Sequence, residues 1–163
     1  MPTGHIDLIV KGGRVIDPAQ NIDRFADVLI EGGRVASVTD GPSETIPDGY
    51  EVIDANGLVV APGFIDLHTH LRVPGEEHKE TIASGTRAAA RGGFTTVCAM
   101  PNTRPAQDRT SVINLVMKMV QETAAIRVLP IAAVTVGRKG EQLTNFSDLA
   151  SVGAIGFSDD GDP

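Results

Sequence analysis

Two histidines one residue apart follow an apolar run in the segment GFIDLHTHLR, residues 63–72. If this segment is a strand, His68 and His70 lie on the same face, because successive side chains of a strand alternate between faces. Neutral imidazole is a common ligand of Zn²⁺. Asp66 would share that face, where it either supports a ligand imidazole or is simply a buried polar residue. The spacing therefore predicts the first half of a metal site; the alternative is a pair of polar residues that line a barrel.

The pair Asp159-Asp160 is the candidate for an oxygen ligand, because it ends the apolar segment AIGFSDD. Only one of two adjacent strand residues can face the site. The alternative is an ordinary Asp-Asp-Gly turn. The presence of the two histidines favours the ligand over the turn.

Arg72 and Asn102 are candidates for binding an anionic substrate. Arg72 stands two residues beyond His70 and would continue the same strand face, where its guanidinium suits a substrate carboxylate. Asn102, in AMPNTRP, would follow the next strand, and its amide either binds the same anion or starts a turn. A surface arginine is the alternative for Arg72.

The first 60 residues predict a small antiparallel β unit. The segments IVKGGRVI (9–16) and LIEGGRVA (29–36) each place a Gly-Gly pair between two β-rich runs, which is typical of a hairpin. A third segment, EVIDANGLVVAPG (51–63), carries Asn56-Gly57 at its turn.

The remaining residues alternate between apolar strands and helices. We expect helices from near Lys79 to Arg91, from an N-cap at Asp108, and over NFSDLASVG. The acidic run around Glu76 is interpreted as charge at the first helix N-terminus. The strands that they connect are GFIDLHTH, FTTVCAM (94–100), RVLPIAAVTV (127–136) and AIGFSDD. Such nearly continuous apolar strands predict a parallel sheet covered on both faces.

The polar residues decide between the two common parallel folds. No Gly-rich phosphate turn follows a strand, which disfavours a doubly wound dinucleotide fold. The candidate site residues instead follow the carboxyl ends of the strands, where the active sites of (β/α)₈ barrels lie. We therefore predict the first four strands of such a barrel. Because a complete barrel takes about 250 residues, further chain or a partner must supply the rest.

Composition excludes several classes of function. The net charge is −7 and there is no Lys/Arg cluster with interleaved aromatic residues, so nucleic acid is not an expected partner. No apolar run is long enough to span a membrane, and the N-terminal segment lacks the pattern of a signal peptide. The single cysteine, Cys98, excludes an internal disulfide framework and predicts a buried, inert thiol. A cytoplasmic protein is expected.

Four stretches together resemble a known family: APGFIDLHTHLRVPG (61–75), the run 76–105 that ends in GGFTTVCAMPNTRP, RVLPIAAVT (127–135) and GFSDDG (156–161). The chain resembles the amidohydrolase superfamily over essentially its whole length, and within it the bacterial dihydroorotases of the longer, two-zinc type. The resemblance implies a β-sandwich domain whose first part is residues 1–60, followed by the first half of a metal-dependent (β/α)₈ barrel at residues 61–163.

The resemblance also implies an activity: interconversion of dihydroorotate and N-carbamoyl-L-aspartate in pyrimidine biosynthesis. His68 and His70 would bind the first of two zinc ions, and Asp160 would bridge both. Arg72 and Asn102 would bind the substrate carboxylate. Two further zinc histidines and the aspartate that acts as general base are expected beyond Pro163, so residues 1–163 alone are expected to be inactive.

Two alternatives remain open. The first is a hydantoinase or dihydropyrimidinase, whose substrates lack the carboxylate that Arg72 and Asn102 would bind. The second is a non-catalytic homologue that serves as a scaffold for aspartate carbamoyltransferase, which some bacterial dihydroorotases bind. A half barrel would expose apolar surface, so a homo-oligomer is expected rather than an isolated monomer.

Overall fold

The computed structural model describes residues 6–162, which form two compact units that meet between Pro62 and Gly63. We call them the β unit (6–62) and the α/β unit (63–162) and describe each by itself. The sequence placed the boundary two residues earlier, between residues 60 and 61.

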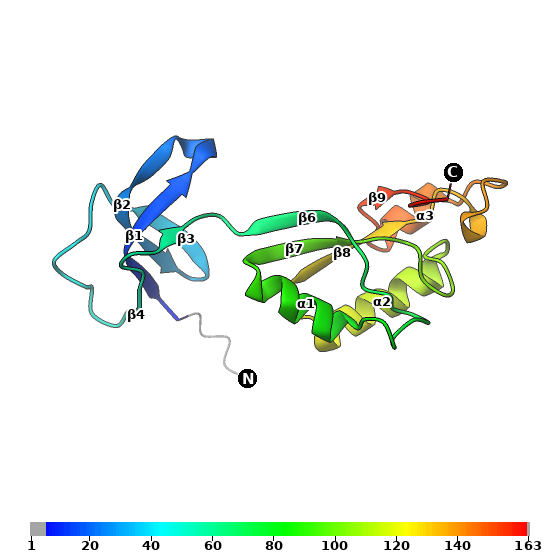
Figure 1. Cartoon of the computed structure of the whole chain (residues 1–163), viewed down its shortest axis with the longest axis horizontal. Coiled ribbons are helices and arrows are strands. Elements are labelled where there is room, and N and C mark those ends of the chain that lie inside the picture. Colours follow the sequence, from blue (N-terminus) through cyan, green and yellow to red (C-terminus); the bar gives the residue numbers. More distant parts are fainter. Residues whose placement is uncertain (1–5, 163) are drawn as a thin grey trace. The chain divides into compact units, whose positions relative to one another are not determined.

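The β unit is one mixed sheet of five strands, in which β3, β2, β1 and β4 are neighbours in that order and β5 also pairs with β1 (Figure 1). The strands are β1 (Leu8–Asp17), β2 (Ile22–Glu31), β3 (Arg34–Val38), β4 (Glu51–Asp54) and β5 (Val59–Val60), with a 3₁₀ turn η1 (Pro18–Gln20) after β1. The first three pair antiparallel, but β4 and β5 both run parallel to β1. The prediction of an all-antiparallel unit was therefore wrong for the last two strands.

Of the two predicted Gly-Gly hairpins, one is correct. Gly32-Gly33 joins β2 to β3, whereas Gly12-Gly13 lies inside β1 at a shift in its register with β2. At that bulge the Gly12 N–H donates to the fully buried Asp27 carboxylate at 2.7 Å. A Cβ on Gly13 would lie 2.5 Å from Val60, so the glycine allows a close approach rather than a chain reversal.

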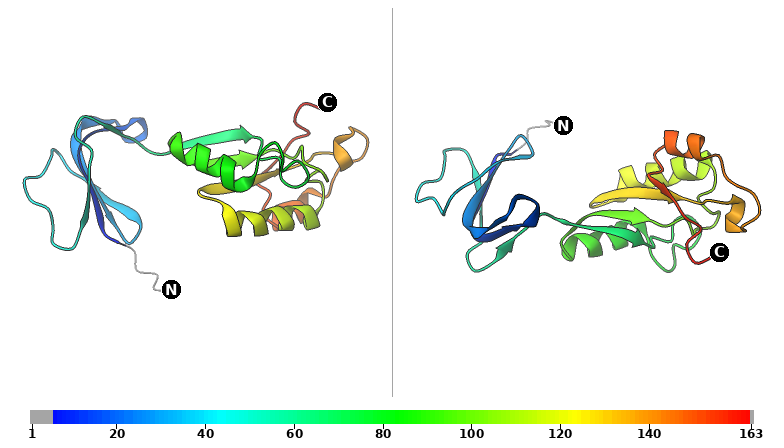
Figure 2. Two further views of the ribbon diagram at one scale, coloured as in Figure 1. Left: turned by 60° about the horizontal axis from the view of Figure 1, so that its bottom comes forward. Right: turned by 90° about the horizontal axis from the view of Figure 1, so that it is seen from above.

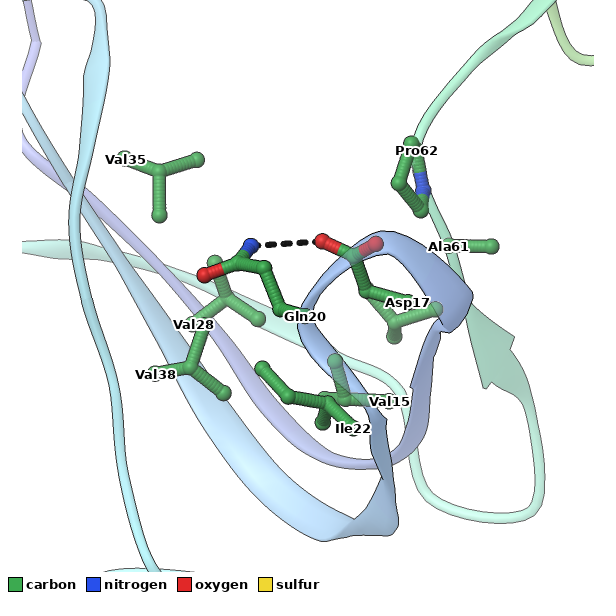
Figure 3. A pocket seen from close by; sticks show the side chains of 10 residues that line it. Val15, Asp17, Gln20, Ile22, Val28, Val35, Val38, Ala61 and Pro62 are labelled. Carbon is green, nitrogen blue, oxygen red and sulfur yellow. Dashed lines mark hydrogen bonds between the residues drawn. The ribbon is translucent and has the colours of Figure 1, made fainter.

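The β unit has a small apolar core. Val15, Ala26 and Val28 are its buried core. Figure 3 shows the hollow beside them, where valines surround a single polar pair, Gln20 bonded to Asp17. With one carboxylate and no basic or nucleophilic partner among its lining residues, this hollow is not the candidate catalytic site.

The α/β unit is a parallel four-stranded sheet with the spatial order β6-β7-β8-β9. Its elements are β6 (Phe64–Thr69), α1 (Ile82–Arg91), β7 (Phe94–Ala99), α2 (Thr110–Thr123), β8 (Arg127–Ala132), η2 (Val136–Arg138), α3 (Phe146–Ser151) and β9 (Gly156–Phe157). Strand order equals chain order, as in a (β/α)₈ barrel, whereas a doubly wound sheet reverses direction along its strand order. The sheet therefore has the topology predicted for part of a barrel.

The core of the α/β unit lies between the strands and the helices. α1 and α2 pack beside each other and lie on the same side of the strands in Figure 1 and in the left view of Figure 2. The main buried cluster is Leu71, Val73, Ile82, Val97, Ala99, Val116 and Val128. Among the strands of residues 6–162, β6 pairs with β7 alone. It exposes Phe64, Ile65 and Leu67, so the expectation of cover on both faces fails for this strand.

Two helices begin later than predicted. α1 begins at Ile82 because Thr81 and Ser84 form a capping box there, which leaves the acidic run of Glu76 outside the helix. α2 has Arg109 as its N-cap, without a side-chain bond. Asp108, the predicted cap, instead accepts the Gly137 N–H at 2.7 Å and pairs with Arg109.

The loops after β6 and β7 are packed backbone against backbone at Gly75. The Arg104 N–H donates to the Pro74 carbonyl at 2.8 Å. Gly75 has φ +95°, and a Cβ on it would lie 2.0 Å from the Arg104 carbonyl oxygen. Glycine is thus required at this position, which brings the segment after His70 against the segment after Asn102.

We predict that Gly75→Ala destabilises the protein more than Gly93→Ala does. Both glycines have positive φ, but a Cβ on Gly93 would meet only ordinary contacts with Phe64 at 3.5 Å. Gly93→Ala should cost about 1–2 kcal/mol from the backbone alone, and Gly75→Ala about 1–3 kcal/mol more from the overlap. Urea unfolding of both variants measures this, and equal losses would contradict the close approach.

Candidate metal centre

Three side chains converge at the carboxyl edge of the sheet. His68 is in β6, His70 follows it, and Asp160 follows β9. Their nitrogen and oxygen ligand atoms all lie within 4.8 Å of one another. The Asp160 Oδ1 is 3.0 Å from His68 Nε2 and 4.0 Å from His70 Nε2. Within residues 6–162 this is the group of His, Cys, Asp or Glu side chains arranged to hold a metal ion.

The two imidazoles reach this point from different backbone settings. β6 ends at Thr69, so His70 lies in the loop, yet the ring centroids are 5.2 Å apart and nearly perpendicular. Asp66, for which the sequence offered support of an imidazole or a buried polar role, is half-buried and accepts the main-chain N–H of His68 at 2.9 Å. Its carboxylate therefore fixes the backbone of the first histidine rather than its ring.

The neighbours Asp159 and Asp160 have separate roles. Asp160 has φ +56°, a left-handed conformation that Asp tolerates better than most residues, and its N–H donates to the Ser158 hydroxyl. This backbone turn directs its carboxylate to the histidines. Asp159 accepts the N–H groups of Val134 and Thr135 at 2.9 and 3.0 Å and the Thr135 hydroxyl at 2.6 Å. Asp160 therefore faces the site, and Asp159 stabilises the loop after β8 through these hydrogen bonds.

We predict that Asp159→Ala lowers the free energy of unfolding by about 2 kcal/mol, because it leaves two backbone N–H donors without an acceptor. Asp159→Asn is the matched control, since its amide oxygen can accept both. It should lose clearly less stability in chemical denaturation. Equal losses in the two variants would contradict this role.

Asn102 lies inside the cluster rather than beside it. Its Oδ1 is 2.9 Å from His70 Nδ1, and its Nδ2 donates to Asp160 Oδ2 at 2.8 Å. The loop after β7 thereby contacts residues from the loops after β6 and β9. The sequence had offered a substrate anion or a local turn for this amide, and neither accounts for these two bonds.

Arg72 does not continue the strand face as predicted, because β6 has ended and Arg72 has φ +60°. Its Nη1 lies 3.5 Å from Glu76, a buried carboxylate that also binds Lys79 at 2.7 Å and lies 3.6 Å from Arg104. The hydrogen bond from Lys79, with the nearby arginines, holds the pKa of the Glu76 carboxyl below its usual value. Glu76 is thus a counter-ion of Lys79 first and of Arg72 and Arg104 at longer distance, not a helix-terminal charge.

The sequence reasoning missed Arg138, whose side chain is 15% exposed. Its Nε donates to the Asp159 carbonyl at 3.0 Å, and its Nη2 lies 2.7 Å from Asp162 and 3.9 Å from Asp160. The rule that polar residues gather after barrel strands would have found it, had it been applied to the loop after β8.

Cys98 is a buried thiol. Its burial and, to a smaller extent, the nearby Asp66 charge raise the pKa of the thiol, as expected for an inert packing residue.

None of the helices formed by residues 6–162 has the length and apolar character needed to cross a membrane.

Comparison with known proteins identifies the family. The Dihydro-orotase-like family model matches residues 57–162. The chain belongs to the dihydroorotase-like family. It is 51% identical over 156 residues to a dihydroorotase of Solibacter usitatus (strain Ellin6076) and 46% identical over 158 residues to one of Aquifex aeolicus (strain VF5). These alignments cover 96% and 97% of this chain but 36% and 37% of the relatives, so the chain spans about a third of their length.

Solved structures with a similar fold include hydantoinases. An L-hydantoinase (dihydropyrimidinase) from Arthrobacter aurescens superposes with a TM-score of 0.75 at 24% identity, over 94% of this chain and 32% of its own. A D-hydantoinase gives a TM-score of 0.66 at 30% identity, over 79% of this chain and 27% of its own. The resemblance to dihydroorotases drawn from the sequence motifs is thus confirmed, and the fold is similar to that of these hydantoinases.

Proposed function

We propose that this dihydroorotase-like chain is part of a dihydroorotase that interconverts N-carbamoyl-L-aspartate and (S)-dihydroorotate. The observation that carries the proposal is the convergence of His68, His70 and Asp160 within 4.8 Å at the carboxyl edge of the sheet, in a chain 51% identical to a dihydroorotase. By the resemblance to dihydroorotases, which this chain matches over about a third of their length, residues outside 1–163 would complete the site and supply the general base.

The donor set fits zinc. Two imidazole nitrogens and one carboxylate oxygen are ligands that Zn²⁺ prefers, and they already point toward a common centre. His68 and His70 would hold the first of two zinc ions, and Asp160 would bridge both. When bound, such ions polarise the reacting carbonyl and lower the pKa of water to near neutrality.

The remaining residues of the site would hold the substrate. Dihydroorotate and N-carbamoyl-L-aspartate both carry a carboxylate, for which Arg72 and Asn102 offer donors. The guanidinium of Arg72 has five N–H donors, and its contact with Glu76 leaves others free. The Asn102 Nδ2 group has a second hydrogen beyond the one donated to Asp160.

The substrate carboxylate separates this proposal from a hydantoinase. We expect turnover of dihydroorotate and little of dihydrouracil, which lacks the carboxylate. Arg72→Met should lower kcat/KM for dihydroorotate by about 10–100-fold through loss of a charged hydrogen bond, while zinc content is unchanged. Steady-state kinetics on both substrates with the complete gene product test this. Preferential turnover of dihydrouracil would replace the proposal by the hydantoinase alternative.

His68→Ala should abolish dihydroorotate turnover and lower zinc affinity by more than about 100-fold, since changes to residues outside the ligand shell already cost 10–100-fold. His78→Ala is the matched control, because His78 is exposed in the loop before α1. Metal analysis and a chelator competition measure the effect. Full activity and unchanged zinc in His68→Ala would refute the assignment, and a wild type that folds without binding zinc would favour the scaffold alternative.

A cytoplasmic location, a homo-oligomer and association with aspartate carbamoyltransferase belong to the same proposal. The carbamoyltransferase rests on the resemblance to dihydroorotases. The homo-oligomer rests on the exposed apolar side chains of β6, and the location on the single free cysteine. Analytical ultracentrifugation of the complete gene product, alone and with the carbamoyltransferase, addresses the last two.

A further inference from the structure

The amide of Asn102 is the one side-chain group that joins a histidine and the carboxylate of the candidate metal centre within the described residues. It accepts from or donates to His70 Nδ1 at 2.9 Å and donates to Asp160 Oδ2 at 2.8 Å. The three residues come from three different loops, after β6, β7 and β9. Asn102 is therefore placed to act on the ligands themselves.

The chemistry of the carboxylate fixes the direction of both hydrogen bonds. An ionised carboxylate only accepts, so the Asn102 atom beside Asp160 must be the NH₂ group. The other atom of the amide is then its oxygen, which also only accepts. It follows that His70 must carry its proton on Nδ1 to make the 2.9 Å bond. A neutral imidazole with a proton on Nδ1 keeps its lone pair on Nε2.

We propose that Asn102 is a positioning residue for the metal centre: through Asp160 it sets the tautomer of His70, so that Nε2 faces the metal with a free lone pair. The inference rests on the metal site proposed above. It assigns Asn102 a second role beside substrate binding. The amide oxygen is bonded to His70 and one Nδ2 hydrogen to Asp160. The other Nδ2 hydrogen remains for the substrate carboxylate.

The loop that carries Asn102 is held in place without this side chain. The Thr103 hydroxyl donates to the Pro105 carbonyl at 2.7 Å, and the Gln107 N–H donates to the Pro101 carbonyl at 3.2 Å. The fully buried Gln107 side chain adds a bond to the Met100 carbonyl at 2.9 Å. Removing the Asn102 amide should therefore release His70 and Asp160 while the loop stays folded.

The first test is the tautomer of His70 in the metal-free protein. Long-range ¹H–¹⁵N correlation spectra of the complete gene product, at a pH well above the usual imidazole pKa of about 6.5, distinguish protonated Nδ1 from protonated Nε2. We expect the Nδ1-protonated form in the wild type and a mixture in Asn102→Ala. A His70 protonated mainly on Nε2 in the wild type would overturn the inference.

The second test is zinc affinity, measured by chelator competition. Asn102→Ala should bind zinc about 10–100-fold more weakly, as for other partners of metal-binding histidines. Arg72→Met should bind zinc as the wild type does. Thr103→Ala loosens the same loop without touching His70, so a loss in Thr103→Ala as large as in Asn102→Ala would show loop support only and overturn the inference. Unchanged affinity in Asn102→Ala would overturn it too.

These readouts separate the inference from the proposed function. A wild type that has the Nδ1-protonated His70 and binds zinc, but does not turn over dihydroorotate, would refute the dihydroorotase assignment and still support the role of Asn102. If the protein turns over dihydroorotate but Asn102→Ala leaves its zinc affinity unchanged, the dihydroorotase assignment is supported and the positioning role of Asn102 is refuted.

Discussion

Parallel hydrogen bonding between strands that are adjacent in the sequence is the constraint on which the site depends. Because β6, β7, β8 and β9 all run in the same direction, the loop after each strand leaves from the same edge. The register pairs Thr69 with Ala99 and Ala132 with Phe157, so the strand ends lie close to level. The backbone pairing of the strands therefore brings the candidate ligands to one edge of the sheet, independently of the contacts between their side chains.

The carboxylate of Asp160 contacts several polar side chains at that edge. Its two oxygens lie near His68 in β6, Asn102 in the loop after β7, and Arg138 in η2. The backbone there is held in conformations that most residues avoid: Arg72, Arg138 and Asp160 have positive φ, and they are three of the four such non-glycine residues in 6–162. Conformations of this kind persist where the surrounding bonds impose them. Here the Asp159 carboxylate holds the backbone after β8, and the Arg138 guanidinium bonds to the Asp159 carbonyl.

The apolar pattern of the sequence was sufficient for the strands, the helices and the parallel order of the α/β unit. The grouping of the two histidines with one residue of the Asp159-Asp160 pair also followed from their positions at the ends of apolar strands, and the resemblance selected Asp160. Side chains that bond to distant backbone were not predictable in this way. Asp108 reads as a helix cap but holds Gly137, and Gly12-Gly13 reads as a turn but forms a bulge against Asp27. The local pattern of apolar residues predicts which side chains are buried, but it does not identify hydrogen-bond partners that lie 15 and 29 residues away in the sequence.

The three-loop construction of the site also affects how the chain folds. Asn102 is 32 residues from His70 and 58 from Asp160 along the chain, so closing these contacts requires ordering most of the α/β unit first. His68, His70 and Asp160 do not lie together while β9 is undocked. A metal ion that needs all three residues would bind late in folding, and its binding free energy would stabilise the folded state alone. Metal supply during synthesis would then influence how much protein reaches the native state.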